Sequence, residues 1–225
     1  MTYEERFSTM PATDTIERPR EALRVARRYL RRERLVSALV VTLVVSLFLG
    51  TYVTTSLFPA VVVAAVLLVI ARAPVLQSTG TVQLRTDDGP ETVLDALTGP
   101  TPPVLALQWG VADEVTREDG VPIYPTSYLF GLRSVRPTVH SQAETTPHGE
   151  HQVEIKIMVN DKPWATYIAT IRDADDQTIV DVEYTSTRRF GLRRVPQQLL
   201  ARRYRDAALS AQGYTVVERD AHFGL

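Results

Sequence analysis

The 225-residue chain contains no cysteine, so disulfide bonds, thiolate metal sites and cysteine nucleophiles are all excluded. It also lacks a glycine-rich phosphate loop, a Gly-x-Ser-x-Gly turn and a His-Glu-x-x-His motif. Charge is missing too from a long stretch, since residues 35–71 hold no acidic or basic side chain. These absences favour a non-enzymatic protein and direct attention to the uncharged stretch.

The uncharged run is too long for one membrane span. A helix over its 37 residues would measure about 55 Å at ~1.5 Å per residue, against a hydrocarbon core of ~30 Å. We therefore expect two transmembrane helices, residues 35–53 and 56–71, that form a hairpin around Gly50 and Pro59. The alternative is a buried core hairpin of a soluble protein. A cleaved signal peptide fits poorly, because 34 residues precede the run.

An arginine-rich segment precedes this run. Residues 19–35 are predicted to form a helix that begins at Pro19 and continues into the first span. Eight arginines lie between Arg18 and Arg34, and by the positive-inside rule they keep this side of the hairpin cytoplasmic. We therefore expect a multi-pass cell-membrane protein with two spans and both termini in the cytoplasm. The arginines expected to reach lipid headgroups are Arg28, Arg31, Arg32 and Arg34.

A nucleic-acid partner is not predicted. The alternative for the N-terminal segment is an arginine-rich arm that binds DNA. Residues 73–225, however, carry 15 basic and 20 acidic side chains, whereas a nucleic-acid-binding domain is expected to be basic. We expect the lipid bilayer to be the partner of the arginines, and the sequence does not identify a protein partner.

The C-terminal part reads as an α+β domain. Residues 81–88 alternate as a strand, and residues 90–98 form a short helix between Pro90 and Gly99. Period-two alternation then predicts six strands and an antiparallel sheet with one buried face, at residues 105–115, 127–133, 135–144, 152–160, 164–172 and 178–186. A helix of about 17 residues follows from Pro196 to Gln212 and ends at Gly213. The pattern of residues 214–220 fits an additional edge strand.

The segment "STRRFGLRRVP" (186–196) joins the last long strand to this helix. Phe190 and Leu192 continue the alternation of Val180, Val182 and Tyr184, which predicts that they finish the buried face of the strand. Seven arginines lie between Arg188 and Arg205 without an acid. Three of them are expected to face anionic headgroups: Arg189, Arg193 and Arg194.

Three stretches carry a resemblance to a known superfamily. They are "GTVQLRTDDGPETVLDAL" (80–97), the run of strands, and the helix from Pro196. In this order they resemble the START-like superfamily (SRPBCC, the polyketide-cyclase type), over roughly residues 80–212. "PPVLALQWGVADEV", "SYLFGLRSV" and "RRFGLRRVPQQLLARRYRDAALSAQGYTVVERD" resemble membrane-anchored members from salt-loving archaea.

The resemblance implies a helix-grip fold, an antiparallel sheet wrapped on a long C-terminal helix, with a cavity that often holds a lipid, sterol or polyketide. The superfamily usually has a second short helix, for which "TGPTPPV" leaves little room. The expected organisation is a disordered tail (1–18), a basic helix with a transmembrane hairpin (19–76) and a START-like domain (77–225).

The side chains expected to line the cavity are apolar or aromatic. We expect the domain to bind an apolar ligand or lipid at the cytoplasmic membrane face, without a cofactor or a metal ion. A structural or protein-interaction module with a solid core is the second hypothesis, and a cyclase-like enzyme is the third. His148 and His151 have a spacing that could hold a metal, but a polar turn explains them better. The predicted ligand-binding residues are Trp109, Tyr128, Phe130, Trp164, Tyr167, Tyr184, Leu200 and Tyr204.

Overall fold

The computed structural model describes residues 14–128, 132–147, 149–174 and 176–224. The helices are α1 (Arg20–Thr54), α2 (Leu57–Arg72), α3 (Pro90–Thr98), α4 (Ala106–Val111) and α5 (Val195–Ser210), with short 3-10 turns η1 (Pro103–Leu105) and η2 (Leu192–Arg194). The strands are β1 (Asp14–Thr15), β2 (Gln77–Thr86), β3 (Thr116–Glu118), β4 (Val121–Ile123), β5 (Thr126–Tyr128), β6 (Arg133–Val135), β7 (Pro137–Thr145), β8 (His151–Val159), β9 (Lys162–Ala174), β10 (Gln177–Ser186) and β11 (Thr215–Gly224).

Most of these strands form one antiparallel sheet. Within the described residues its order is β1-β3-β4-β7-β8-β9-β10-β2-β11, and β5 and β6 form a separate hairpin. Val153, Ile155 and Ile157 on β8 are buried while Lys156 between them is exposed. This alternation confirms the prediction of an α+β fold with one buried sheet face.

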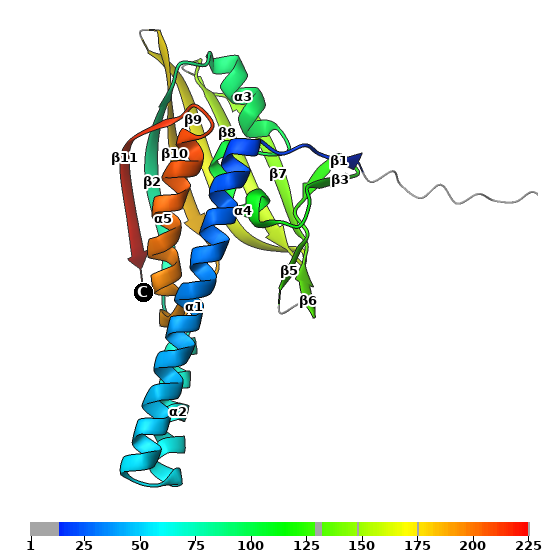
Figure 1. Cartoon of the computed structure of the whole chain (residues 1–225). Coiled ribbons are helices and arrows are strands. Elements are labelled where there is room, and N and C mark those ends of the chain that lie inside the picture. Colours follow the sequence, from blue (N-terminus) through cyan, green and yellow to red (C-terminus); the bar gives the residue numbers. More distant parts are fainter. Residues whose placement is uncertain (1–13, 129–131, 148, 175, 225) are drawn as a thin grey trace, which may run out of the picture.

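Helices α3, α4 and α5 cover that face. Val93 and Leu97 of α3, Trp109 of α4, and Tyr204 and Ala208 of α5 join the sheet residues in one buried cluster. Figure 1 shows α5 and α1 lying side by side. The sheet and the long C-terminal helix therefore enclose the core between them.

Two predicted strands are different in the structure. Residues 105–115, predicted to be a strand, form η1 and α4, because Pro102 and Pro103 start a turn and Leu105 and Trp109 share a helical face at i and i+4. The second short helix of the superfamily, for which "TGPTPPV" was expected to leave little room, is therefore present as α4. Residues 127–133 contribute to two strands, β5 and β6, rather than to one.

The end of the last long strand is also different from the prediction. β10 ends at Ser186, and the backbone of Phe190 instead pairs with Leu76, which follows α2. Leu192 lies in η2 and is 45% exposed, so it does not complete the buried sheet face. The proline at position 196 and the turn at η2 start α5 before the alternation can continue.

The arginine-rich helix is joined to the apolar segment without a break, as predicted. The first turns of α1 pack on α4 and α5, and Ala22 and Ala26 are completely buried there. A Cβ atom on Gly110 of α4 would lie 2.5 Å from the Cβ of Ala26, so this close approach requires glycine. Helix α1 is therefore part of the folded domain as well as part of the hairpin.

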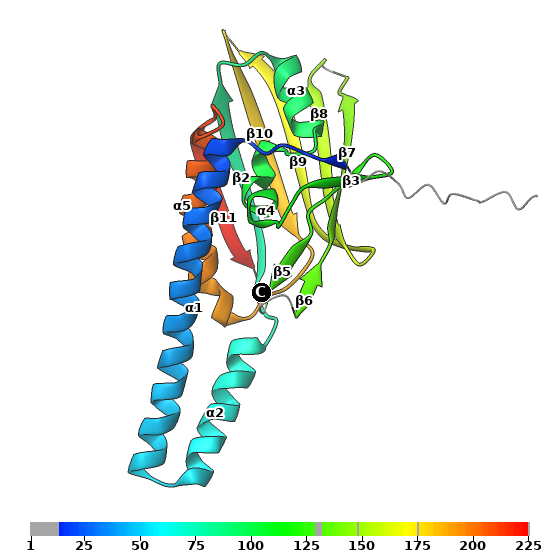
Figure 2. The same cartoon turned by 45° about the vertical axis from the view of Figure 1, so that its right-hand side comes forward.

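The apolar half of α1 extends beyond the domain beside α2 (Figure 2). Among the described residues, α1 alone is long and apolar enough to cross a membrane, and its apolar window is 0% buried. This exposure contradicts the alternative of a buried core hairpin. Helix α2 is apolar but has 16 residues, fewer than the ~20 of a usual span. The prediction of two transmembrane spans is therefore supported for the first helix only.

Candidate functional site

A cavity of about 500 Å³ lies between the inner face of the sheet, α4 and α5. Its size falls within the ~300–1,000 Å³ that is usual for small-molecule sites. The exposed end is formed where α2 leads into β2, at Arg72 and Pro74, and by the loop that connects β10 to η2. The cavity therefore opens beside Arg72 and Pro74. Figures 1 and 2 show that the helical hairpin extends from this end of the domain.

The sheet supplies an apolar and aromatic wall. Ile157 of β8 is paired with Ala165 of β9, and Tyr167 of β9 is paired with Tyr184 of β10. The rings of Tyr167 and Tyr184 are stacked with their centroids 6.0 Å apart. A bulge between Ile157 and Met158 inserts Trp164 as an extra residue, and Trp164 consequently lines the cavity together with Ala165.

Helix α4 faces this wall with Gln108 and Val111. The side-chain amide of Gln108 donates a hydrogen bond of 3.1 Å to the hydroxyl oxygen of Tyr167. Burial raises the pKa of the Tyr167 hydroxyl, although the nearby Arg205 guanidinium acts in the opposite direction. Tyr167 is therefore a neutral phenol at pH 7, and its oxygen already accepts one bond, so its O–H is left to donate to a ligand.

Within the described residues, the charged side chains that line the cavity are all arginines. We call them the arginine group: Arg72, Arg188, Arg189, Arg194 and Arg205. Arg194, Gln198 and Arg205 face the cavity from η2 and α5, and Arg205 donates a hydrogen bond of 3.4 Å to Gln198. The guanidinium carbon of Arg188 lies 5.9 Å from the ring centroid of Trp164, within cation–π range. One wall of the cavity is thus cationic and the opposite wall is apolar.

The predicted ligand-binding residues have different positions. Trp164, Tyr167 and Tyr184 come together in the cavity wall. Trp109 is completely buried in the core on α4, where its indole N–H donates a 2.9 Å bond to the carbonyl of Pro102. Tyr128 is 43% exposed on β5 and lies outside the cavity lining. Phe130 lies outside the described residues.

The two predicted ligand-binding residues on α5 pack elsewhere. The ring of Tyr204 lies 5.7 Å from that of Tyr29, between α5 and α1. Leu200 is partly buried against the core cluster. Both side chains therefore stabilise the packing of α5 in the domain. Neither is found in the cavity lining among the described residues.

The sequence prediction missed the polar residues of the lining and part of its apolar wall, such as Ile157 and Ala165. Gln108 lies in residues 105–115, which were predicted to form a strand, and Arg72 and Arg205 are more than 130 residues apart in the chain. A helical rather than alternating interpretation of residues 105–111 would have placed Gln108 and Val111 together at i and i+3. No local pattern could have indicated that Arg72 and Arg205 share a cavity.

The predicted membrane-surface arginines fall into two groups. Arg28, Arg31, Arg32 and Arg34 are exposed along α1. Arg189 and Arg194 are exposed at the open end of the cavity, and the side chain of Arg193 lies outside the described residues. The second group therefore belongs to the candidate site as well as to the surface.

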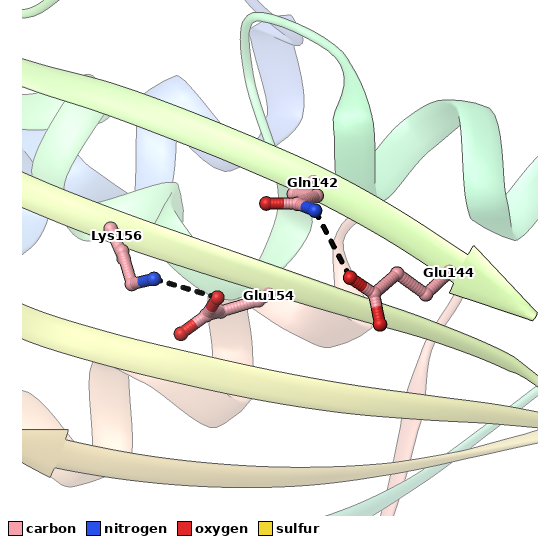
Figure 3. Close-up of polar contacts among 4 residues, drawn as sticks. All are labelled: Gln142, Glu144, Glu154 and Lys156. Atoms are coloured by element: carbon pink, nitrogen blue, oxygen red, sulfur yellow. Dashed lines mark hydrogen bonds and ion pairs between the residues drawn. The ribbon is translucent and has the colours of Figure 1, made fainter. Parts of the chain in front are cut away.

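The outer face of the sheet is polar and solvated. Lys156 donates to Glu154 at 2.8 Å, and Gln142 donates to Glu144 at 3.0 Å, each pair being two residues apart on one strand (Figure 3). His151, from the candidate metal spacing, lies at the end of β8 on the side that α3 covers, 3.5 Å from Glu91 of that helix, and His148 is outside the described residues. These contacts are surface pairs, so we place the candidate site on the inner face.

Comparison with known proteins yields matches in structure only. No family model and no curated protein matches the chain. Mll3558 from Rhizobium loti is 18% identical, with a TM-score of 0.39 over 60% of this chain and 96% of that protein. Ara h 8.0201 is 10% identical, with a TM-score of 0.34 over 59% and 95%. A conserved protein from Geobacillus kaustophilus is 11% identical, with a TM-score of 0.36 over 65% and 99%.

At TM-scores below 0.5 these matches carry no argument of their own. The assignment of the fold rests on the order and packing of the elements in this chain. A strand, two short helices, an antiparallel sheet and a long C-terminal helix enclose the core and the cavity described above. The fold is α+β, a large antiparallel sheet packed against a long C-terminal helix. The order of these elements agrees with the one that the START-like resemblance implies, and α1 adds a further long helix.

Proposed function

We propose that the chain is a membrane-tethered, START-like binding protein that holds a ligand with an apolar part in the cavity of its helix-grip domain. The cavity carries this proposal, because its volume of about 500 Å³ and its wall of Ile157, Ala165 and Trp164 suit an apolar body. Arginines and tyrosines are the titratable groups of the described lining. Neither type is a general base at neutral pH, which supports binding rather than catalysis.

The helical hairpin is the proposed anchor. From Leu35 to Thr54 α1 has 20 apolar or uncharged residues, about 30 Å at ~1.5 Å per residue, which matches the hydrocarbon core. Helix α2 spans only about 24 Å by the same measure, so we expect local thinning of the bilayer and snorkelling of Arg72 to complete the second crossing. The arginines of α1 orient both termini toward the cytoplasm.

This arrangement places the open end of the cavity next to the bilayer. Arg72 ends the second span and also lines the cavity. A Cβ atom on Gly191, in the connecting loop, would overlap the carbonyl oxygen of Ala71, so the loop and the end of α2 are in close contact. An apolar molecule could therefore pass between the membrane and the cavity over a short path.

Filling the cavity tests the proposal. Ala165→Phe adds an aromatic ring to the cavity wall, whereas Ala143→Phe adds the same ring at an exposed position on β7 of the same sheet. The full chain in maltoside micelles is titrated with the neutral probe 1-dodecanol, and bound probe is counted by native mass spectrometry. We expect one bound dodecanol in the wild type and in Ala143→Phe, and at least a tenfold weaker complex in Ala165→Phe, as expected when a ring occludes the site.

The experiment requires the full chain, because Ala22 and Ala26 of α1 are buried in the domain and truncation before β2 would expose its core. If the wild type and Ala165→Phe take up dodecanol equally, the cavity is not the site. The alternative of an interaction module with a closed core would then be favoured.

A further inference from the structure

We infer that the ligand is an anionic amphiphile, an apolar chain that carries a phosphate or carboxylate group, with its charge bound by the arginine group. This inference rests on the proposed function and specifies the chemical class of the ligand. The sheet wall and α4 would contact the chain, and the wall formed by η2, α5 and the β10–η2 loop would contact the acidic group.

The first argument is charge. The described lining contains five arginines and no acidic residue, although residues 73–225 as a whole carry more acidic than basic side chains. Three other arginines of the domain are paired with carboxylates: Arg136 with Glu118, Arg172 with Asp181 and Arg219 with Asp206. In the described part of the chain, no such ion pair is found for the arginine group. A concave site with one sign of charge attracts ligands of the opposite sign.

The second argument is the burial of Arg205. Its side chain is only partly exposed, it reaches the neighbourhood of the Tyr167 hydroxyl, and its hydrogen bond to Gln198 is a long one of 3.4 Å. A charge withdrawn from water is costly unless an opposite charge or good hydrogen bonds replace the water. An acidic group between Arg205 and the Tyr167 hydroxyl would provide both. Phosphates and carboxylates are also the partners that a guanidinium binds in a bidentate manner.

The third argument is the separation of the two chemistries. Arg194, Gln198 and Arg205 line the helix side, and Ile157, Ala165 and Tyr184 line the sheet side. Arg188 lies where the cationic and the aromatic sides meet, because its guanidinium lies against the ring of Trp164. A purely apolar ligand would leave the arginines facing hydrocarbon, and a small inorganic anion would leave the aromatic wall unoccupied. A molecule with both parts satisfies both walls.

The test uses probes that share one chain length. The full chain in phosphatidylcholine nanodiscs is titrated with dodecyl phosphate, dodecanoate, dodecylphosphocholine and 1-dodecanol. We expect the two anionic probes to bind at least tenfold tighter than the zwitterionic and neutral ones, as charge-assisted hydrogen bonds imply. We also expect this preference to weaken as salt is raised.

A matched pair of variants locates the effect. Arg205→Met removes the charge that faces the cavity and keeps an unbranched apolar side chain, whereas Arg203→Met removes an exposed charge two residues away on α5. Arg205→Met is expected to lose about tenfold in affinity for dodecyl phosphate while its affinity for dodecanol stays unchanged. Arg203→Met should behave as the wild type. Binding of dodecanol also shows that each variant is folded.

The outcomes separate the inference from the proposed function. If dodecanol binds and Ala165→Phe blocks it, but no anionic preference is seen, the inference is wrong and the proposed function stands. If anionic probes bind equally well to Ala165→Phe, they bind at the membrane surface and the inference is overturned. If inorganic phosphate displaces dodecyl phosphate with equal affinity, the site takes a free anion and not an amphiphile. If no probe binds, the proposed function itself fails.

Discussion

Trp109 and Trp164, the two tryptophans of the chain, occupy opposite kinds of environment. Trp109 is 0% exposed in the core and has its indole hydrogen bond satisfied by the carbonyl of Pro102. Trp164 is partly buried and faces the cavity beside Arg188. The same residue type is therefore structural at one position and available to a ligand at the other.

This difference can be measured with two substitutions. Trp109→Phe removes packed volume and the indole hydrogen bond to the Pro102 carbonyl, which still accepts from the Leu105 N–H. This should cost about 1–3 kcal/mol of unfolding free energy and leave dodecanol affinity unchanged. Trp164→Phe should leave the thermal midpoint near that of the wild type and weaken dodecanol binding. Thermal unfolding and probe titration of the full chain measure the two effects.

Fluorescence provides an internal control, because each variant retains one tryptophan. The emission of Trp164 in Trp109→Phe should shift when dodecanol or dodecyl phosphate enters the cavity. The emission of Trp109 in Trp164→Phe should not change. A ligand-dependent shift in the second variant would place the ligand near Trp109 and contradict the assignment of the site.

At the scale of the elements, the contact between α1 and α4 determines whether the proposed membrane anchor is packed rigidly against the domain. Arg18, just before α1, donates to the backbone carbonyls of Trp109 and Ala112 at 3.1 and 2.7 Å and so satisfies the C-terminal end of α4. Ala26 then packs directly against Gly110. Residues 14–34 are therefore bound to the domain, although the sequence suggested a tail followed by a helix at the membrane surface.

Gly110→Ala tests this contact. Within a helix, replacing glycine by alanine normally stabilises by about 1 kcal/mol, but here the new Cβ would overlap Ala26. We expect a net loss of about 1–3 kcal/mol, as for overpacking of a core, measured by thermal unfolding of the full chain. Gly89→Ala is the control, since its Cβ would meet no atom within 4 Å. Equal stability of the two variants would show that α1 is not fastened to α4.

At the scale of the whole molecule, the hairpin and the cavity meet at one end of the domain. Arg72 belongs to both, and the loop at Gly191 packs on the end of α2. Under the proposed anchoring, the membrane topology determines which compartment and which leaflet would supply the proposed ligand. The proposed orientation makes the supply cytoplasmic.

The absence of cysteine makes this orientation easy to measure. Thr55→Cys places a single thiol in the exposed turn between α1 and α2, and Ala143→Cys places one at an exposed position on β7. A membrane-impermeant maleimide should label Thr55→Cys in intact cells and Ala143→Cys only after permeabilisation. Labelling of Ala143→Cys in intact cells would put the domain outside and reverse the topology.

The parts of the structure that sequence predicted well depend on near neighbours along the chain. Strand alternation in residues 152–160, the proline and glycine limits of α3 and α5, and the unbroken helix from the arginines into the apolar run are all local patterns. The error at residues 105–115 came from the same source, because apolar residues at every second position also included Leu105 and Trp109 at helical spacing.

By itself, the sequence determined an α+β domain with a one-sided antiparallel sheet, a long C-terminal helix and an apolar N-terminal helical segment. Only the tertiary structure decided that α1 belongs to the core, that a bulge directs Trp164 into a cavity, and that Arg72 and Arg205 face the same space. These features arise from contacts between residues far apart in the chain, such as Arg18 with Ala112. No periodicity encodes such contacts, because they depend on how whole elements pack.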